Sequence, residues 1–433
     1  EGYRLTVGRR KITVNCSDED GAFYAVQTLL QILTDKGLPC VRIEDAPRFP
    51  YRGFHLDVSR HFFPKEEIFL LLDQMARYKM NYFHLHLTDN GGWRVKLDRY
   101  PELTAKGSFR TQKSWIEWWD KQDRHYLDEG TPNAYGRYYT KDELREIVEY
   151  AAANHIKVIP EIEFPAHSDA VFISHPELCC KGRAYTSGEF CAGNPQTYEF
   201  FENVLDEIME VFPSDYIHIG GDEAKQEGRE VCPAGQQRIK DEGLKDESEL
   251  QSYFIKRIES YLNTKGRKII GWDEILEGGV SRTATVMSWR GTKGGIEAAK
   301  LGNDVIMTPS DYYYLDHFQT ADPVKNKEPL AIGGYTSLKK SYSFDPFDQL
   351  TDYESQFIKG IQCNLWTEYI PDYKQAQHML LPRLAALSEV AWSNFHRTSY
   401  DQFVERVETS LLPLYDSAEY NYADYAFQNP PIE

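Results

Sequence analysis

The sequence lacks a long apolar run and an excess of positive charge. No run of about 18 apolar residues occurs, so no membrane-spanning segment is predicted, and the first residues, EGYRLTVGRR, do not form a signal peptide. Lys and Arg number 49 against 67 Asp and Glu, which gives a formal net charge of -18. This balance opposes binding to nucleic acid or to an anionic membrane surface, and it favours neutral or cationic partners.

Cysteines are few and irregularly spaced. The seven cysteines are an odd number without the spacing typical of zinc sites, so the sequence indicates neither a disulfide framework nor a metal site. One local disulfide bond, from Cys179 or Cys180 to Cys191, stays open as an alternative. Repeats, heptads and low-complexity tracts are also missing. We expect no metal and no cofactor.

Aromatic residues, in contrast, are abundant. They make up 14% of the chain, with 29 Tyr and 8 Trp, and many follow acids and amides in predicted loops. Such loops suit sugars, whose apolar faces stack on aromatic rings while their hydroxyls bind carboxylates. An aromatic-rich core explains most of the Phe and some of the Tyr, but it explains the Trp residues less well.

The order of strands and helices predicts an α/β fold. Residues 1–45 read as a strand pair and a helix, and we interpret them as the last part of a small α/β domain that packs against the main domain. Residues 46–395 alternate strands with helices and predict a closed parallel (β/α)8 barrel, the TIM barrel. Residues 396–433 are expected to form a helical or irregular extension on it. The eight predicted strands are 53–59, 81–89, 157–167, 216–224, 268–274, 284–291, 304–309 and 360–368.

Two further segments carry specific expectations. The connection 92–139 is long for a compact fold, and connections of that length are usually functional or lid-like. The Leu- and Ala-rich segment 375–392 is predicted to form one helix after the last strand.

The segment YIHIGGDEA, residues 216–224, contains the most informative motif. A buried strand ends in two glycines and presents Asp222 and Glu223, which places both acids at the carboxyl end of the strand, where α/β barrels hold their active sites. In the alternative interpretation, Asp222 caps the next helix and Glu223 is a solvated acid of its first turn.

Other predicted strands end in similar groups. Polar or aromatic residues that bind or react follow the strands at one end, and a requirement for stability alone does not predict that bias. The groups are Asp57 with Arg60, Asp89, residues 161–167, Trp272, Trp289, and Trp366 with Glu368.

These motifs resemble the family 20 glycoside hydrolases, the β-N-acetylhexosaminidases. The similarity covers residues 50–393 through YRGFHLDVSRHF, HLHLTD, EIEFPAH, HIGGDEA, GWDEI, MSWRG, YYYLD, LWTE and SEVAWS. The segment GAFYAVQTLLQIL also resembles the end of the α/β domain that precedes the barrel in this family, so we expect the chain to begin inside a larger precursor. The chain differs in reading PAH where many relatives have PGH.

The resemblance implies a retaining, exo-acting hydrolase that removes terminal β-linked GlcNAc or GalNAc from glycans. In this family the substrate's own acetamido oxygen is the nucleophile, and an oxazolinium intermediate forms. The residues agree with this scheme, because consecutive carboxylates lie too close together to flank a sugar ring as acid and water-activating base.

The resemblance also implies roles for individual residues. Glu223 would be the general acid and base, Asp222 would orient the acetamido N–H, and Tyr314 would donate to the acetamido oxygen. The expected substrate-binding residues are Arg52, Asp89 and Glu368 for hydroxyls, Trp272, Trp289 and Trp366 for the acetamido methyl group, His167 as support for the acid, and Asp316 near the sugar.

Alternative interpretations stay open. Trp272 and Trp289 could belong to the barrel core, Arg52 could form a salt bridge with Asp57, and His167 could be a structural hydrogen bonder. Another function class is a metal-dependent amidohydrolase built on histidines such as His84 and His86; a further class is a non-catalytic, lectin-like barrel.

Within the family, a lacto-N-biosidase or an enzyme for sulfated GlcNAc also fits. The resemblance implies an enzyme exported by a bacterium, either to the periplasm or to the cell surface.

Overall fold

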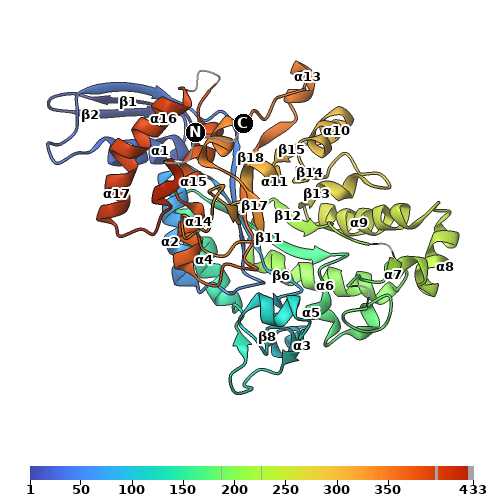
Figure 1. Ribbon diagram of the computed structural model, residues 1–433. Helices are drawn as coiled ribbons and strands as arrows, with labels where there is room; N and C mark the ends of the chain where they lie inside the picture. Colours follow the sequence, from blue (N-terminus) through green and yellow to red (C-terminus); the bar gives the residue numbers. More distant parts are fainter. Residues whose placement is uncertain (187, 226, 395–397, 428–433) are drawn as a thin grey trace.

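A computed structural model describes residues 1–186, 188–225, 227–394 and 398–427. Eight parallel strands form a closed barrel in the order β11-β12-β13-β14-β15-β18-β4-β5 (Figure 1). This confirms the predicted TIM barrel and each of its eight strands. The strands are β4 (Tyr51–Asp57), β5 (Tyr82–His86), β11 (Lys157–Phe164), β12 (Tyr216–Gly220), β13 (Lys268–Trp272), β14 (Thr285–Ser288), β15 (Val305–Met307) and β18 (Ile358–Leu365).

Burial explains why these segments form strands. Every residue of β4 is buried, because helices cover its outer face and the barrel interior covers the other. The last strand, β18, pairs with β4 from Gly360 opposite Tyr51 to Leu365 opposite Leu56, and this pairing closes the barrel. All eight carboxyl ends therefore meet at one rim.

Helices surround the barrel and follow the strands. They are α2 (Lys65–Arg77), α4 (Lys141–Ala153), α6 (Pro195–Val211), α9 (Glu247–Thr264), α10 (Lys293–Leu301), α14 (Tyr373–Leu380) and α15 (Arg383–Trp392). The prediction of one helix over 375–392 is wrong. Pro382 separates α14 from α15, because proline has no N–H to continue the hydrogen-bond ladder and its ring clashes with the preceding turn.

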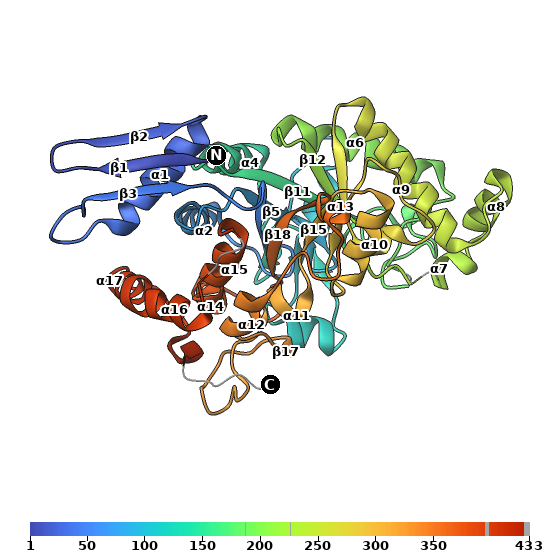
Figure 2. The same cartoon turned by 90° about the horizontal axis from the view of Figure 1, so that it is seen from above.

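The first 45 residues form a small α/β unit that packs on the barrel. Strands β1 (Tyr3–Val7), β2 (Ile12–Cys16) and β3 (Val41–Asp45) form an antiparallel sheet in the order β2-β1-β3, with α1 (Glu19–Ile32) against it. The sequence did not predict β3. The unit lies at the end of the molecule opposite α8 (Figure 2). Trp392 of α15 packs into its core beside Tyr24.

Shorter helices and strands lie at the carboxyl-end rim and on the outside of the barrel. The connection 92–139 carries a small sheet in the order β10-β8-β9. The remaining elements include β6 (Thr88–Asp89), β7 (Gly92–Trp93), α3 (Pro101–Gly107), β8 (Phe109–Arg110), β9 (Tyr126–Leu127), β10 (Tyr135–Gly136), α5 (Asp169–Phe172), α7 (Glu227–Glu230), α8 (Pro233–Glu242), α11 (Ser310–Tyr313), β16 (His317–Phe318), β17 (Gly333–Tyr335), α12 (Leu338–Ser343) and α13 (Asp352–Ser355).

The predicted C-terminal extension contains α16 (Tyr400–Arg406) and α17 (Leu412–Ser417). It contacts the barrel domain, since Tyr342 donates a hydrogen bond to the Thr398 carbonyl at 2.7 Å. Residues 396, 397 and 428–433 of that extension lie outside the described residues. Within the described part of the chain, no helix is long and apolar enough to cross a bilayer.

Candidate active site

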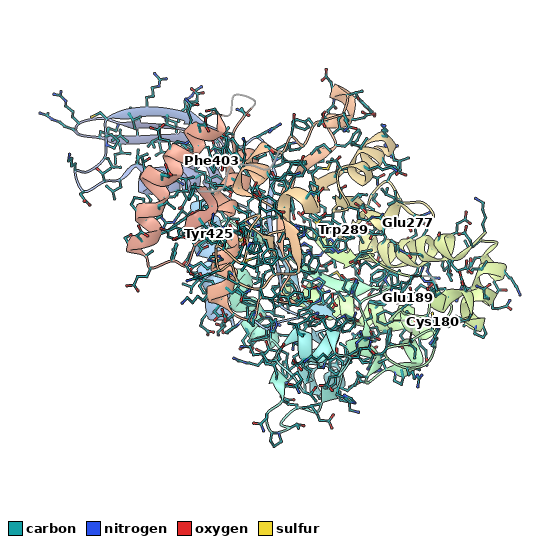
Figure 3. All side chains as sticks on the ribbon, viewed as in Figure 1. Cys180, Glu189, Glu277, Trp289, Phe403 and Tyr425 are labelled. Atoms are coloured by element: carbon teal, nitrogen blue, oxygen red, sulfur yellow. The ribbon has the colours of Figure 1, made fainter. Side chains whose placement is uncertain are left out.

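A cavity of about 390 Å³ opens at the carboxyl-end rim of the barrel. Its lining contains most of the predicted site residues. These are His167, Asp222, Glu223, Trp272, Trp289, Tyr314, Asp316, Trp366 and Glu368. A cavity of about 470 Å³ lies elsewhere, between α1 and α15–α17 near Phe403 (Figure 3), but its one carboxylate, Glu389, is paired with Arg406. The rim cavity is therefore the candidate site.

A left-handed turn after β12 presents the two adjacent acids. Gly220, Gly221 and Glu223 have φ values of 69°, 96° and 49°. A Cβ atom at Gly220 would lie 1.8 Å from Oε2 of Glu163, so only glycine fits there. The next helix, α7, begins at Glu227, so Asp222 is not its cap and that alternative is wrong.

The two acids have different environments. The Glu223 side chain is 57% exposed, whereas that of Asp222 is 12% exposed. Glu223 therefore reaches the open side of the cavity, and Asp222 lies deeper. Two neighbouring carboxylates can in this way take different roles.

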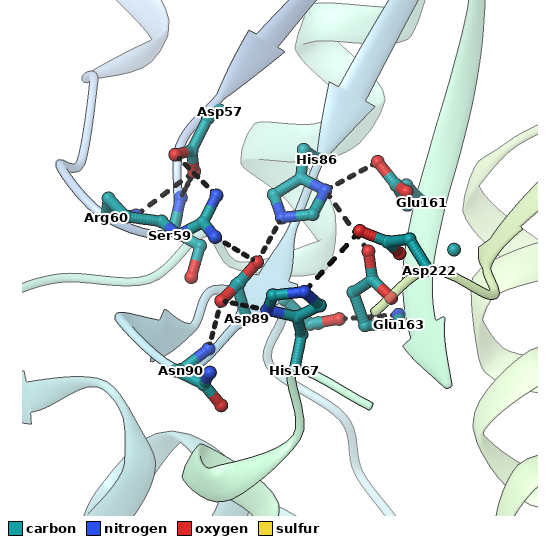
Figure 4. A network of polar contacts seen from close by, with 12 residues as sticks. Asp57, Ser59, Arg60, His86, Asp89, Asn90, Glu161, Glu163, His167 and Asp222 are labelled. Atoms are coloured by element: carbon teal, nitrogen blue, oxygen red, sulfur yellow. Dashed lines mark hydrogen bonds and ion pairs between the residues drawn. The ribbon is translucent and has the colours of Figure 1, made fainter. Parts of the chain in front are cut away.

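His167 connects these acids to the interior. Its Nε2 atom lies 3.4 Å from Oδ2 of Asp222 and 3.3 Å from Oε2 of Glu223. Its Nδ1 atom lies 3.4 Å from Oδ1 of Asp89 (Figure 4). Burial opposes its protonation, but the carboxylates of Asp89 and Asp222 outweigh burial and raise the pKa of His167 well above its ordinary value.

The backbone of the PAH motif takes a left-handed conformation at His167 and not at Ala166. His167 itself has a φ of 51°, in the left-handed region, whereas Ala166 is not among the non-glycine residues with positive φ. The alanine in place of the glycine common in relatives therefore causes no backbone strain.

Arg52 was predicted to bind the sugar, and this prediction is wrong. It lies near the start of β4, at the amino end of the barrel, because a strand rises about 3.3 Å per residue and only its last residues reach the rim. It is buried and donates to the Tyr24 hydroxyl at 2.9 Å and to the Glu1 carboxylate at 2.9 Å. Arg52 thus ties the N-terminal α/β unit to the barrel and does not pair with Asp57.

Arg60 is the arginine of the cavity. Its Nη2 atom lies 2.9 Å from Oδ2 of Asp89 and 3.6 Å from Oε1 of Glu368, and its guanidinium lies 5.1 Å from the Trp366 ring centroid. Its Nη1 atom lies 3.2 Å from Asp57 Oδ2. The sequence analysis placed Asp57 and Arg60 together at a strand end, and that pattern could have identified Arg60 as a residue of the cavity.

Asp89 does not line the cavity. It is 2% exposed and lies behind Arg60 and His167, and it also contacts Nε2 of His86 at 2.9 Å. The structure therefore corrects the expectation that it touches a sugar hydroxyl. Burial raises its pKa, but the Arg60 and His167 charges outweigh burial and lower it far below the ordinary range.

Four aromatic side chains form one wall. The ring centroids of Trp272 and Trp366 are 5.8 Å apart, and those of Trp289 and Tyr314 are 6.0 Å apart with nearly parallel planes. Trp272 is 1% exposed and also packs on Ile270, so it belongs to the barrel core as well as to the cavity. The wall offers an apolar surface next to Asp222.

Buried carboxylate oxygens are available to a ligand. In the described residues, Asp222 Oδ1, Asp316 Oδ1 and Glu368 Oε2 are buried without a hydrogen-bond partner. Burying an acceptor without a partner is costly, so these oxygens indicate that a ligand with several N–H or O–H donors binds here. Burial, and then the charge of Glu368, raise the pKa of Asp316 well above its ordinary value.

Glu274 is a second residue that the sequence interpretation missed. Its Oε2 accepts a hydrogen bond from the Trp289 indole N–H at 2.9 Å. Burial, and then repulsion from Asp222, raise the pKa of Glu274 to about 8. It therefore holds a proton near neutral pH and positions Trp289.

Four histidines surround Glu161 inside the barrel. His84 Nε2 and His218 Nδ1 each lie 2.9 Å from a Glu161 oxygen, and His55 and His86 complete the group. Trp272 donates its indole N–H to Glu161 at 2.9 Å. Because these histidines and Glu161 are 0% exposed, the group has no surface for a substrate, and an amidohydrolase centre is not supported.

Comparisons with known proteins agree with the sequence resemblance. The model of glycosyl hydrolase family 20, catalytic domain, matches residues 49–395, and the model of domain 2 of the same family matches residues 1–46. A β-hexosaminidase of Porphyromonas gingivalis is 41% identical over 96% of this chain and 53% of its own length.

Solved structures give the same result. A β-N-acetylhexosaminidase from Bacteroides fragilis superposes with a TM-score of 0.82 at 31% identity, covering 98% of this chain and 83% of that one. An exo-β-N-acetylglucosaminidase from Vibrio harveyi, in complex with N-acetylglucosamine, gives 0.85 at 30% identity, covering 97% and 67%. The chain spans 53% and 64% of the lengths of two curated relatives, those of P. gingivalis and Vibrio furnissii.

Proposed function

Because the chain belongs to glycosyl hydrolase family 20, we propose that it is an exo-acting β-N-acetylhexosaminidase. It removes terminal β-linked GlcNAc or GalNAc with retention of configuration. The observation that carries this proposal is the pair of adjacent acids, exposed Glu223 and deep Asp222, beside an aromatic wall. The Vibrio harveyi relative named above was solved with N-acetylglucosamine, which supports the sugar assignment.

The first step follows from where the two acids lie. The acetamido oxygen of the substrate attacks the anomeric carbon, the glycosidic C–O bond breaks, and Glu223 gives its proton to the leaving oxygen. The unpartnered Oδ1 of Asp222 accepts the acetamido N–H and stabilises the positive charge that develops on the oxazolinium ring. The products of this step are the free aglycone and a bound oxazolinium.

The second step reverses the role of Glu223. Its carboxylate takes a proton from water, the water oxygen bonds to the anomeric carbon, and the bond between that carbon and the acetamido oxygen breaks. Two inversions at the same carbon give net retention. In the free cavity the contact with His167 at 3.3 Å lowers the pKa of Glu223, and a bound sugar that excludes water opposes this effect.

The aromatic wall protects the internal nucleophile. Trp272, Trp289 and Trp366 surround the acetamido methyl group and exclude competing water, while the Tyr314 hydroxyl donates to the acetamido oxygen. This arrangement holds that oxygen near the anomeric carbon before reaction, which reduces the entropy lost in the transition state.

The remaining polar groups recognise one terminal sugar. Arg60, Asp316 and Glu368 also line the cavity and suit vicinal hydroxyls. A volume of about 390 Å³ is near the lower end of small-molecule sites, which run from about 300 to 1,000 Å³. A cavity of this size suits one residue and supports exo action.

Hydrolysis of chromogenic β-GlcNAc and β-GalNAc glycosides tests the proposal. We expect release of the aglycone, inhibition by the oxazoline mimic thiazoline, and loss of both activities in Glu223→Gln. Sugar binding without turnover in the unchanged protein would instead indicate a lectin-like barrel. Release of a disaccharide, or activity on 6-sulfated GlcNAc alone, would assign the chain to the alternative specificities of the family.

Export is part of the same proposal. The relatives named above come from bacteria and are named β-hexosaminidase and β-N-acetylhexosaminidase. Fractionation of the native bacterium, with an antibody against this chain, is expected to find the protein in the periplasm or at the cell surface; a cytoplasmic location would contradict it.

A further inference from the structure

Three cysteines that are distant in sequence meet beside the catalytic rim. The Sγ atoms of Cys180, Cys191 and Cys232 all lie within 4.8 Å of one another, and those of Cys191 and Cys232 are 3.4 Å apart. Cys191 and Cys232 are buried at 4% and 3% exposure, and Cys180 is partly buried. Figure 3 shows Cys180 next to Glu189, on the side of the molecule that carries α7 and α8.

Ordered backbone on both sides positions these thiols. The Cys180 N–H donates to the Glu189 carbonyl at 3.2 Å, and the Cys191 N–H donates to the Leu178 carbonyl at 2.7 Å, so these two cysteines lie on paired segments after β11. Cys232 is the N-cap of α8, and its sulfur accepts from the Gly235 N–H at 3.5 Å. The cluster therefore joins the segment 178–191 to the segment that follows Glu223.

We propose that these three thiols bind a zinc ion. Zinc takes thiolate ligands at about 2.3 Å in a tetrahedron, which places neighbouring sulfurs about 3.8 Å apart, close to the spacing here. Among the described residues no fourth His, Cys, Asp or Glu joins the group, so a water molecule takes the fourth position. Each thiol releases its proton to solvent as its bond to zinc forms.

The number of cysteines favours a metal over a disulfide bond. A disulfide would join two of the sulfurs at about 2.05 Å and leave the third without a function. Three sulfurs that all lie within 4.8 Å of one another can bind one ion together, as in a thiolate metal site. The α8 N-terminus at Cys232 adds a positive dipole that offsets the negative charge of three thiolates.

The zinc ion would fix one side of the active site. The loop from Gly221 to Cys232 carries Asp222 and Glu223 at one end and the proposed ligand at the other. The Arg229–Glu189 ion pair, at 3.3 Å and fully buried, joins the same two segments. The metal would act in folding and positioning, away from the reacting sugar.

Elemental analysis of the purified full chain tests the proposal. After expression with zinc and extensive dialysis, we expect about one zinc per chain, and titration with a mercurial thiol reagent should release it to a colorimetric zinc indicator. Cys191→Ser and Cys232→Ser should lose the bound zinc. Cys179→Ser is the matched control, since Cys179 is buried beside the cluster but its sulfur donates to the Arg183 carbonyl, and this variant should retain zinc.

A second measurement guards against variants that fail to fold. Cobalt(II) exchanged into the unchanged protein should give the intense thiolate charge-transfer absorption and the visible bands of a tetrahedral site. A chain without metal, a peptide map of the unreduced protein with Cys191 linked to Cys232, or zinc that persists in Cys191→Ser would each overturn the proposal. None of these outcomes depends on hydrolytic activity.

Discussion

The Nε2 atom of His167 lies 3.3 Å from Oε2 of Glu223. Because Asp89 contacts the other ring nitrogen at 3.4 Å, the imidazole is fixed between an interior carboxylate and the proposed acid. This contact orients the Glu223 side chain although more than half of it is exposed. An acid that is both accessible and oriented can protonate a leaving group without a large cost in side-chain entropy.

Glu223→Gln should lower kcat by about 10²–10⁴-fold on p-nitrophenyl β-GlcNAc, which is the usual worth of general acid–base catalysis. KM should change little, because the amide keeps the size of the side chain. The first step should recover with a 2,4-dinitrophenyl leaving group, which departs without a proton. Steady-state kinetics on both substrates measures the difference, and Glu277→Gln, an exposed acid nearby, is the control. An equal loss of kcat/KM, which reports the first step, on both substrates would argue against the role as acid; kcat itself stays low on both, because Glu223 is also the base of the second step.

Asp222→Asn should lower kcat by about 10²–10³-fold, because a neutral amide no longer stabilises the oxazolinium charge. Thiazoline should bind more weakly by a similar factor, since it mimics that intermediate. Comparison of the inhibition constant of thiazoline with that of the product GlcNAc separates weaker binding of the intermediate mimic from weaker binding of the sugar. If both constants change equally, Asp222 does not stabilise the charge of the oxazolinium, and that part of its role is contradicted.

The sequence predicted the barrel and the acid pair because both are local patterns. A buried strand followed by GGDE identifies its own carboxyl end, and the structure places Asp222 and Glu223 in the cavity. Arg52 was misplaced because the sequence of β4 alone does not show how far along the strand the rim lies. The Cys180, Cys191 and Cys232 cluster was missed because loops bring it together, and Glu274 was missed because only packing reveals its burial.

Substitution of Arg60 and of Arg52 tests the conclusion that Arg60, and not Arg52, belongs to the active site. Arg60→Ala should lower kcat/KM by about 10-fold to 100-fold, because it removes a cation that contacts Asp89 and Glu368 in the cavity. Arg52→Ala should leave kcat/KM nearly unchanged but lower Tm, since it leaves buried partners such as the Lys79 carbonyl unsatisfied. Kinetics at low temperature together with calorimetry separates the two effects. A kcat/KM loss in Arg52→Ala without any loss of stability would reverse this assignment.

Glu274 predicts a pH dependence of stability. Its pKa is raised from 4.5 to about 8 by burial and by Asp222. The folded protein therefore keeps a proton that the unfolded chain loses above pH 4.5, and the free energy of unfolding falls as pH rises from 4.5 to about 8. Glu274→Gln removes this proton uptake and keeps an acceptor for Trp289. At pH 8 this variant should be more stable than the unchanged protein by at most about 5 kcal/mol, because the difference between pKa 4.5 and about 8 corresponds to about 1.4 kcal/mol for each pKa unit.

The same substitution should extend activity to higher pH. Above pH 8 the unchanged protein acquires a negative charge on Glu274, next to Trp289, and repulsion between this charge and Asp222 favours displacement of the Asp222 side chain from the position that the acetamido group requires. The Glu274→Gln variant cannot acquire this negative charge, so its kcat should fall less than that of the unchanged protein between pH 8 and pH 9. Thermal unfolding and kcat measured from pH 5 to pH 9 test both effects. Glu277→Gln changes an exposed carboxylate on the same Arg290 and should alter neither curve; parallel curves for Glu274→Gln and the unchanged protein would show that Glu274 is already ionised.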